Sequence, residues 1–288
     1  MGEKDISEKL LADYEDVFAD IVNVLLFHGE KRVRPDSLQS TKTISHYKAD
    51  DSRLHEQERD VLKAWVDGQI QIALIGLENQ TVPLERMSVR IFGYEGANYR
   101  SQLESDQITP VISLVLYFGT EDRWTKPRHL KELLNIPSGL EDYVNDCHIH
   151  VFEIAWLPDE QIDLFESDFG IVARYFSQIR KNKDYIPDDP RTIQHVDAVL
   201  KLLAVMSGDH RYEEILASTD SKTEVTNMCS VAQRLEDRGI EKGRVEGRIE
   251  LLVSLCKNGH ISIEVAADQM HITPEEFRKY LDEAASEA

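Results

Sequence analysis

The sequence of 288 residues has no apolar run approaching the ~20 residues that a membrane-spanning helix requires. Three of its first five residues, Glu3, Lys4 and Asp5, are charged and an amphipathic pattern follows them, so a secretory signal peptide is not expected. The three cysteines, Cys147, Cys229 and Cys256, are odd in number and far apart, which argues against a disulfide framework or a CxxC metal clip. We therefore expect a cytoplasmic protein with reduced thiols and no membrane association.

Positive charge is scarce as well, since 33 Lys and Arg stand against 53 Asp and Glu and the formal net charge is −20. Extensive nucleic-acid binding needs clustered Lys and Arg, so this balance weighs against a broad DNA-covering surface. A nuclease needs only a local basic groove, and its metal site itself requires carboxylates. Three short basic runs could supply such a groove or could be ordinary solvated segments: residues 31–34, 126–131 and 180–183.

Several common catalytic signatures are also missing from the sequence. There is no recognisable Ser/His/Asp arrangement, phosphate-cradling glycine loop or dinucleotide fingerprint. What the sequence does contain is 41% hydrophobic residues, with charge spread along its whole length. This composition is typical of a globular protein with a sizeable core.

Apolar periodicity predicts a mixed α/β core. A helix is expected over residues 8–27, where apolar side chains recur at helical spacing. The clearest hairpin follows, and then come a crossover helix and two apolar strands. The expected ranges are 61–66 and 70–77 for the hairpin, 83–103 for the crossover helix, and 111–118 and 149–156 for the strands. The polar segment before the hairpin, up to about residue 56, is expected to be loop-rich.

From about residue 160 the periodicity becomes helical, with elements expected over residues 163–179, 192–207 and 222–234. The predicted organisation is a nuclease-like core in residues 1–160, a helical extension in residues 161–235 and a tail in residues 236–288.

The tail begins with a charged helix, expected over about residues 230–257, that carries a glycine at every fourth position: Gly239, Gly243 and Gly247. Each glycine costs a helix ~1 kcal/mol relative to alanine, so three on one face suggest close approach of another helix. Homo-oligomerisation through this helix is our hypothesis, and a frayed linker is the alternative. Ser262 and Thr273 are expected N-caps of two final helices that resemble a small helix-turn-helix. The second of these is acidic, which favours protein contact over DNA reading.

Candidate chemistry depends on the register of the hairpin. If its turn spans residues 67–71, Asp60 lies directly opposite Glu78 on one face of the sheet. Gln80 follows on the same face, so two carboxylates and an amide oxygen would converge. Oxygen ligands suit Mg²⁺, which can orient water, lower its pKa and neutralise charge on a phosphate in transfer.

Other turns break this arrangement. A three-residue turn keeps both carboxylates on one face but offsets them by four residues, ~13 Å at ~3.3 Å per residue, which is too far to share an ion. A two-residue turn puts Glu78 on the opposite face. The geometry therefore depends on turn length or on a bulge, and spacing alone leaves open whether Asp60 and Glu78 are ordinary surface residues.

Several motifs in order along the chain resemble one family. They are Arg59-Asp60-Val61, Ile75-Gly76-Leu77-Glu78-Asn79-Gln80-Thr81, Met87-Ser88-Val89-Arg90 with Tyr94, and Tyr99-Arg100-Ser101-Gln102. Together with residues 111–119, residues 146–156 and the glycine-spaced tail, they cover most of the chain. The combination is similar to the Rpn family of recombination-promoting nucleases and proposed transposases, a branch of the PD-(D/E)xK nuclease superfamily. The resemblance implies an α/β fold with a restriction-endonuclease-like mixed sheet flanked by helices, and a helical C-terminal extension.

The resemblance also implies a DNA endonuclease that hydrolyses phosphodiester bonds in recombination, mobile-element or defence contexts. Asp60 and Glu78 would bind Mg²⁺ or Mn²⁺, and Gln80 would take the position usually held by a lysine that positions the attacking water. Glutamine cannot carry a charge or a proton as lysine can, and a glutamine here resembles the Rpn variant. The alternative is a catalytically inactive nuclease-fold interaction or regulatory protein that oligomerises through its tail.

Supporting residues are expected on two helices. Glu15 or Asp16 of the first helix could add an acidic group near the metal. Arg90 and Tyr94, one helical turn apart, could touch phosphate from the crossover helix, although such a pair is also compatible with plain packing. The His148 and His150 pair shares one face of a strand, and the resemblance assigns that segment to the structural sheet instead of a metal site.

Overall fold

The computed structural model describes residues 11–41, 44–48, 54–58, 61–67, 70–217 and 225–286. The chain divides into two compact units, Met1–Cys229 and Ser230–Ala288. Within the described residues, no helix is both long enough and apolar enough to cross a membrane.

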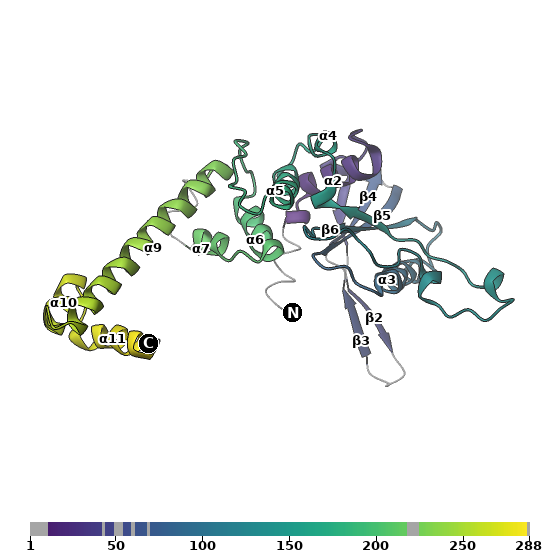
Figure 1. Ribbon diagram of the computed structural model, residues 1–288. Helices are drawn as coiled ribbons and strands as arrows, with labels where there is room; N and C mark the ends of the chain where they lie inside the picture. The colour runs from purple at the N-terminus through teal and green to yellow at the C-terminus, as the bar shows by residue number, and fades with distance from the viewer. Residues whose placement is uncertain are drawn as a thin grey trace. The chain divides into compact units, whose positions relative to one another are not determined.

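A five-stranded mixed sheet forms the centre of the first unit (Figure 1). In spatial order its strands are β1 (Leu38–Ser40), β4 (Val61–Asp67), β5 (Ile70–Gln80), β6 (Val111–Tyr117) and β7 (His150–Glu153). The first three of these are antiparallel neighbours, and β5, β6 and β7 run parallel. The predicted hairpin, the strand of residues 111–118 and the α/β class are confirmed.

Two expectations about strands are wrong. The segment up to residue 56 contains β1 and a separate antiparallel hairpin, β2 (Ile44–Lys48) with β3 (Leu54–Glu58). These strands are short and polar, so they lack the apolar run by which a buried strand is recognised. The strand expected to reach Trp156 ends at Glu153 and continues as a 3₁₀ turn, η4 (Ile154–Trp156). The Ala155 carbonyl accepts a hydrogen bond from Arg180 Nε at 2.7 Å, which fixes this turn against a helix.

Helices cover both faces of the sheet (Figure 1). One face packs against α3 (Met87–Ser101), and the other lies toward α2 (Glu15–Phe27) and α5 (Phe169–Lys181). The crossover helix is confirmed. The helix expected over residues 8–27 is interrupted at residues 13–14, so that α2 begins at Glu15, and it ends as expected at Phe27, before His28, which adopts the left-handed conformation with φ 54°. The helix expected to begin at residue 163 begins at Phe169, after the short α4 (Asp159–Ile162).

The remaining elements of the first unit are α6 (Val196–Ser207), α7 (Arg211–Ala217) and three 3₁₀ turns, η1 (Pro35–Ser37), η2 (Leu130–Leu133) and η3 (Glu141–Tyr143). Among the largest fully buried side chains of this unit are Phe18 of α2, Phe169 and Phe176 of α5, Tyr94 of α3, Tyr212 of α7 and one charged residue, Lys63 of β4.

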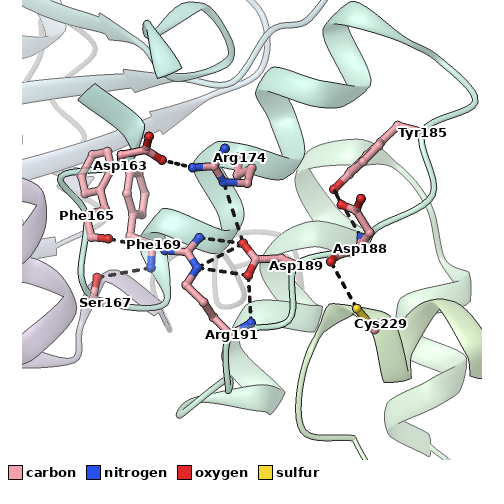
Figure 2. Close-up of polar contacts among 10 residues, drawn as sticks. All are labelled: Asp163, Phe165, Ser167, Phe169, Arg174, Tyr185, Asp188, Asp189, Arg191 and Cys229. Atoms are coloured by element: carbon pink, nitrogen blue, oxygen red, sulfur yellow. Dashed lines mark hydrogen bonds and ion pairs between the residues drawn. The ribbon is translucent and has the colours of Figure 1, made fainter. Parts of the chain in front are cut away.

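A polar network holds the segment between α5 and α6 (Figure 2). Asp189, whose side chain is 6% exposed, accepts hydrogen bonds from Arg191 at 2.7–3.1 Å and lies 3.9 Å from Arg174. Arg174 also pairs with Asp163. Burial raises the pKa of Asp189, but the two guanidinium groups outweigh it and hold the pKa below its ordinary value. The network thus joins α5 to the segment that precedes it and to the segment that follows it.

The second unit is helical. It contains most of α9 (Met228–Lys257), followed by α10 (Ile263–Met270) and α11 (Pro274–Ser286). The two predicted caps are confirmed, because Ser262 Oγ accepts from the Val265 amide at 3.4 Å and Thr273 exchanges hydrogen bonds with Glu276 in a capping box. A small apolar core with Phe277 at its centre packs these helices together.

Candidate active site

The register of the β4–β5 hairpin decides which side chains can meet. Asp67 pairs with Ile70, so the hairpin is tighter than the turn over residues 67–71 that would align the two carboxylates. A bulge between Trp65 and Val66 then shifts the register by one residue, and Val61 lies opposite Leu77. The bulge thus restores, over residues 61–65, the alignment that the longer turn would produce. Asp60 itself lies outside the described residues.

Glu78 is fully buried near the carboxyl end of β5, the central strand of the sheet. Its side chain lies on the face that α3 covers, since its register partner Val115 belongs to the apolar cluster shared with α3. From that helix Arg90 places Nη2 3.2 Å from Glu78 Oε2. Arg90 also donates from Nε to the Tyr94 hydroxyl at 2.6 Å. Three of the predicted site residues therefore form one connected group.

Gln80 is the last residue of β5 and lies on the same face as Glu78, because side chains alternate along a strand. Its side chain is partly exposed, and its backbone carbonyl accepts a hydrogen bond from the Phe118 backbone amide at 2.8 Å. In register beside it lie Tyr117 of β6 and Glu153 of β7. Burial raises the pKa of the Tyr117 hydroxyl above its ordinary value, and the nearby carboxylate of Glu153 contributes to the increase. A row of polar groups thus follows the carboxyl ends of the parallel strands.

The two acidic residues expected from the first helix do not reach Glu78. Glu15 lies 3.3 Å from the ammonium group of Lys63. Lys63 pairs in register with Ile75 and so points to the opposite face of the sheet from Glu78. Asp16 contacts the imidazole of His195 at 3.1 Å. Both carboxylates therefore serve other ion pairs in this structure.

Three histidines cluster around the start of β7, which begins at His150 and lies at the edge of the sheet. The rings of His129 and His148 are 4.6 Å apart, those of His148 and His150 are 5.1 Å apart, and Asp146 accepts from His129 at 2.8 Å. Burial lowers the pKa of His148, and the neighbouring histidines lower it further. Among the described residues, no group of three or more His, Cys, Asp or Glu side chains could hold a metal ion.

The donor chemistry at the end of β5 nevertheless fits a hard divalent cation. Glu78 offers a buried carboxylate and Gln80 an amide oxygen on the same face. Mg²⁺ and Mn²⁺ prefer such oxygen ligands, and Mg²⁺ commonly binds through one or two carboxylates while keeping several waters. The second expected carboxylate, Asp60, precedes the first described residue of β4.

The sequence patterns did not identify two residues that form polar contacts on this sheet, Lys63 and Glu153. Lys63 is a lone charged residue inside an apolar strand, and that position was the available signal of a buried ion pair. Glu153 occupies a strand position whose contacts come from a loop far away in sequence, since it accepts from the Trp124 amide at 2.7 Å. Local sequence carries no signal of such a contact.

Comparison with known proteins adds no further constraint, because no family model, curated protein or solved structure matches this chain.

Proposed function

We propose that this chain is a divalent-metal-dependent nuclease of the Rpn type, with a restriction-endonuclease-like core, that hydrolyses phosphodiester bonds in DNA. The observation that carries the proposal is the buried carboxylate of Glu78, 3.2 Å from Arg90 of the following helix. Glutamate is almost never fully buried without a partner or a task. Its position at the end of a central strand is where an α/β sheet commonly presents functional groups.

The hairpin register supports the same proposal. Val61 lies opposite Leu77, and in the sequence Asp60 precedes the former and Glu78 follows the latter. In the proposed site this pairing continues for one more residue, so that Asp60 and Glu78 bind one Mg²⁺ or Mn²⁺ ion.

The bound ion would lower the pKa of a water molecule and neutralise charge on the scissile phosphate. The chain's own residues supply the remaining tasks. Gln80 can both donate to and accept from a water, and so orients it without carrying a charge. Arg90 can turn from Glu78 to a phosphate oxygen, for which a guanidinium is well suited. Tyr94, 2% exposed, holds Arg90 in place through its hydroxyl.

Nicking of supercoiled plasmid tests the proposal. The wild-type chain is expected to nick with Mg²⁺ or Mn²⁺ and to stop in EDTA. Glu78→Gln and Asp60→Asn should each reduce the rate by about 10²-fold or more, the usual cost of removing one group that stabilises the transition state. Equal nicking by all proteins, or no nicking by a folded wild type, contradicts the nuclease proposal.

Matched controls separate chemistry from folding. Glu104→Gln and Asp106→Asn make the same changes at exposed positions after α3 and should leave the rate unchanged. Because Glu78 is buried, its variant also needs a thermal melt, and Mn²⁺ titration by calorimetry gives a readout that does not depend on turnover.

One observation favours a second candidate function. In α9 a Cβ added to Gly239, Gly243 or Gly247 would meet nothing within 4 Å in the described structure. Glycine lowers helix propensity, and no contact within the described structure requires a glycine at these positions. The three glycines are therefore compatible with close packing against a second copy of the chain. In that case the chain is an assembly module that keeps the nuclease fold, and loss of self-association rather than of metal binding is what abolishes its function.

A further inference from the structure

Two basic segments that are far apart in sequence meet on one tryptophan at the carboxyl end of β7. The guanidinium carbon of Arg123 lies 4.8 Å from the centroid of the Trp156 ring, and that of Arg180 lies 4.3 Å from it. Such cation–π contacts orient a guanidinium without consuming its hydrogen-bond donors. The side chain of Arg123 remains 62% exposed.

The ring itself is held rigidly. Trp156 donates from Nε1 to the Gly119 carbonyl at 3.0 Å, at the end of β6. A Cβ at Gly119 would lie 2.0 Å from the Tyr117 hydroxyl oxygen, so any other residue there would displace the Tyr117 side chain. On the other side Arg180 Nε donates to the Ala155 carbonyl at 2.7 Å. The strand ends and α5 therefore fix this tryptophan and its two arginines together.

The same surface continues toward Glu78. Arg123 and Arg128 lie 3.3 and 3.8 Å from the carboxylate of Glu153, which sits in the row with Gln80. Strands are ~4.8 Å apart, so Glu153 lies about 10 Å across the sheet from Gln80. One strand of B-DNA rises ~3.4 Å per nucleotide along the duplex axis, so this distance corresponds to about three nucleotides of a duplex whose axis runs along the row.

Basic side chains gather on this surface. The six are Arg123, Lys126, Arg128, Arg180, Lys181 and Lys183, and the carboxylates in contact with them are Glu85, Glu121, Glu153 and Asp159. Asp122, Glu160 and Asp184, each next in sequence to one of these residues, add further acids. What marks this surface is therefore the orientation of two arginines on one ring, and not an excess of positive charge.

We infer that Arg123 and Arg180, oriented by Trp156, bind backbone phosphates of duplex DNA about three nucleotides from the Glu78 site. This inference rests on the proposed function for its ligand class and adds the surface that holds the substrate. Arginine is suited to the task because its planar donors match phosphate oxygens. Since the ring is already covered by guanidinium groups, Trp156 positions them and does not stack on a base.

Fluorescence anisotropy with a labelled DNA duplex tests the inference in Ca²⁺ or EDTA, where cleavage does not interfere. The Arg123→Gln and Arg180→Gln double variant of the full chain is expected to bind at least 10-fold more weakly. Its plot of log affinity against log salt should be shallower by about 2, since each lost phosphate contact removes ~0.9 from the slope. Arg123→Gln alone should remove about 1, and it leaves the hydrogen bond of Arg180 intact if the double variant proves unstable.

Arg211→Gln is the matched control. Arg211 is an exposed, ion-paired arginine at the start of α7, and it lies outside the three basic runs and outside the proposed surface. Equal affinity and slope for the wild type, the control and the double variant overturn the inference, as does failure of the wild type to bind duplex DNA while it binds single strands, RNA or nothing.

The plasmid assay distinguishes the two proposals. If DNA binding depends on Arg123 and Arg180 but no nicking occurs, the proposed DNA-binding surface is supported and the proposed nuclease function is contradicted. If nicking depends on metal but DNA binding does not depend on either arginine, only the proposed surface is contradicted.

Discussion

Arg90 and Glu78 lie 3.2 Å apart across the boundary between α3 and the end of β5, and the carboxylate of this pair is fully buried. In the proposed nuclease this ion pair is a resting arrangement, because the same carboxylate has to bind a divalent cation. A guanidinium so close to Glu78 competes with that cation for the carboxylate.

Replacing Arg90 by methionine is therefore expected to separate metal binding from cleavage. Cleavage should fall by about 10²-fold, because a donor to the phosphate is lost, while the Kd for Mn²⁺ should stay the same or become tighter. Calorimetric titration and plasmid nicking measure the two quantities. Arg86→Met, at the exposed start of the same helix, is the control. If Arg90→Met abolishes Mn²⁺ binding in a folded protein, the pair is structural and the proposed role of Arg90 is wrong.

Lys63 provides a test on the opposite face of the sheet. Its ammonium group is fully buried and lies 3.2 Å from Asp13 and 3.3 Å from Glu15, both of which are half-exposed or more. Removing the two acids leaves a buried charge uncompensated, so Asp13→Asn with Glu15→Gln should cost about 3–5 kcal/mol of unfolding free energy. Lys63→Met should be close to neutral, since the acids can then be solvated.

Urea denaturation measures both variants. The single variant Glu15→Gln, compared with Lys63→Met, also tests whether Glu15 helps to bind the metal, as the sequence suggested. If Glu15→Gln alone weakens Mn²⁺ binding while Lys63→Met does not, Glu15 acts at the metal site despite its contact with Lys63.

The hairpin shows how far the sequence alone could lead. Its two apolar runs, joined at Asp67-Gly68, predicted both strands, because strands that are covered on both faces are apolar along most of their length. The turn could not be predicted, since a tight turn with a bulge and a longer turn without one give the same pairing of residues 61–65. The choice depends on local backbone geometry, which leaves no signature in hydrophobicity.

The candidate site shows the same limit. Helical spacing and the order of motifs predicted Arg90 and Tyr94 as possible phosphate contacts, but not the 3.2 Å ion pair of Arg90 with Glu78. The contacts of Glu15 and Asp16 with Lys63 and His195 were not predicted either, because they join residues that are up to 179 positions apart. The polar strands β2 and β3 were missed because only their pairing, and not their composition, makes them strands.

Asp189 should make stability depend on pH. Its folded-state pKa is lowered by Arg191 and Arg174 despite burial, so its stabilising contribution is complete above the ordinary aspartate value of ~3.9. The contribution is lost as the pH falls through the lower folded value. Asp189→Asn should cost about 3 kcal/mol at pH 7, the lower end for a broken buried pair, and the difference from wild type should shrink below pH 4.

Denaturant unfolding at pH 7 and at several values below pH 4 gives the comparison. Asp184→Asn changes an exposed acid in the same connection and is expected to have little effect at either pH. A difference between Asp189→Asn and wild type that is constant over the whole range contradicts the ionic origin of the stabilisation (Figure 2).

Gly243 of α9 tests whether the tail assembles. It shares one helical face with Gly247 and with the exposed apolar side chains of Ile240 and Leu251, which are 63% and 59% exposed. Gly243→Ala should stabilise an isolated helix by up to about 1 kcal/mol. If a second copy packs on this face, the added methyl group instead weakens self-association.

The control is Val245→Ala, which raises helix propensity on the opposite side of the helix and does not change the glycine face. Sedimentation equilibrium and melting at several protein concentrations should therefore show weaker association for Gly243→Ala only. Unchanged association, with a higher melting temperature for both variants, would contradict assembly through this helix.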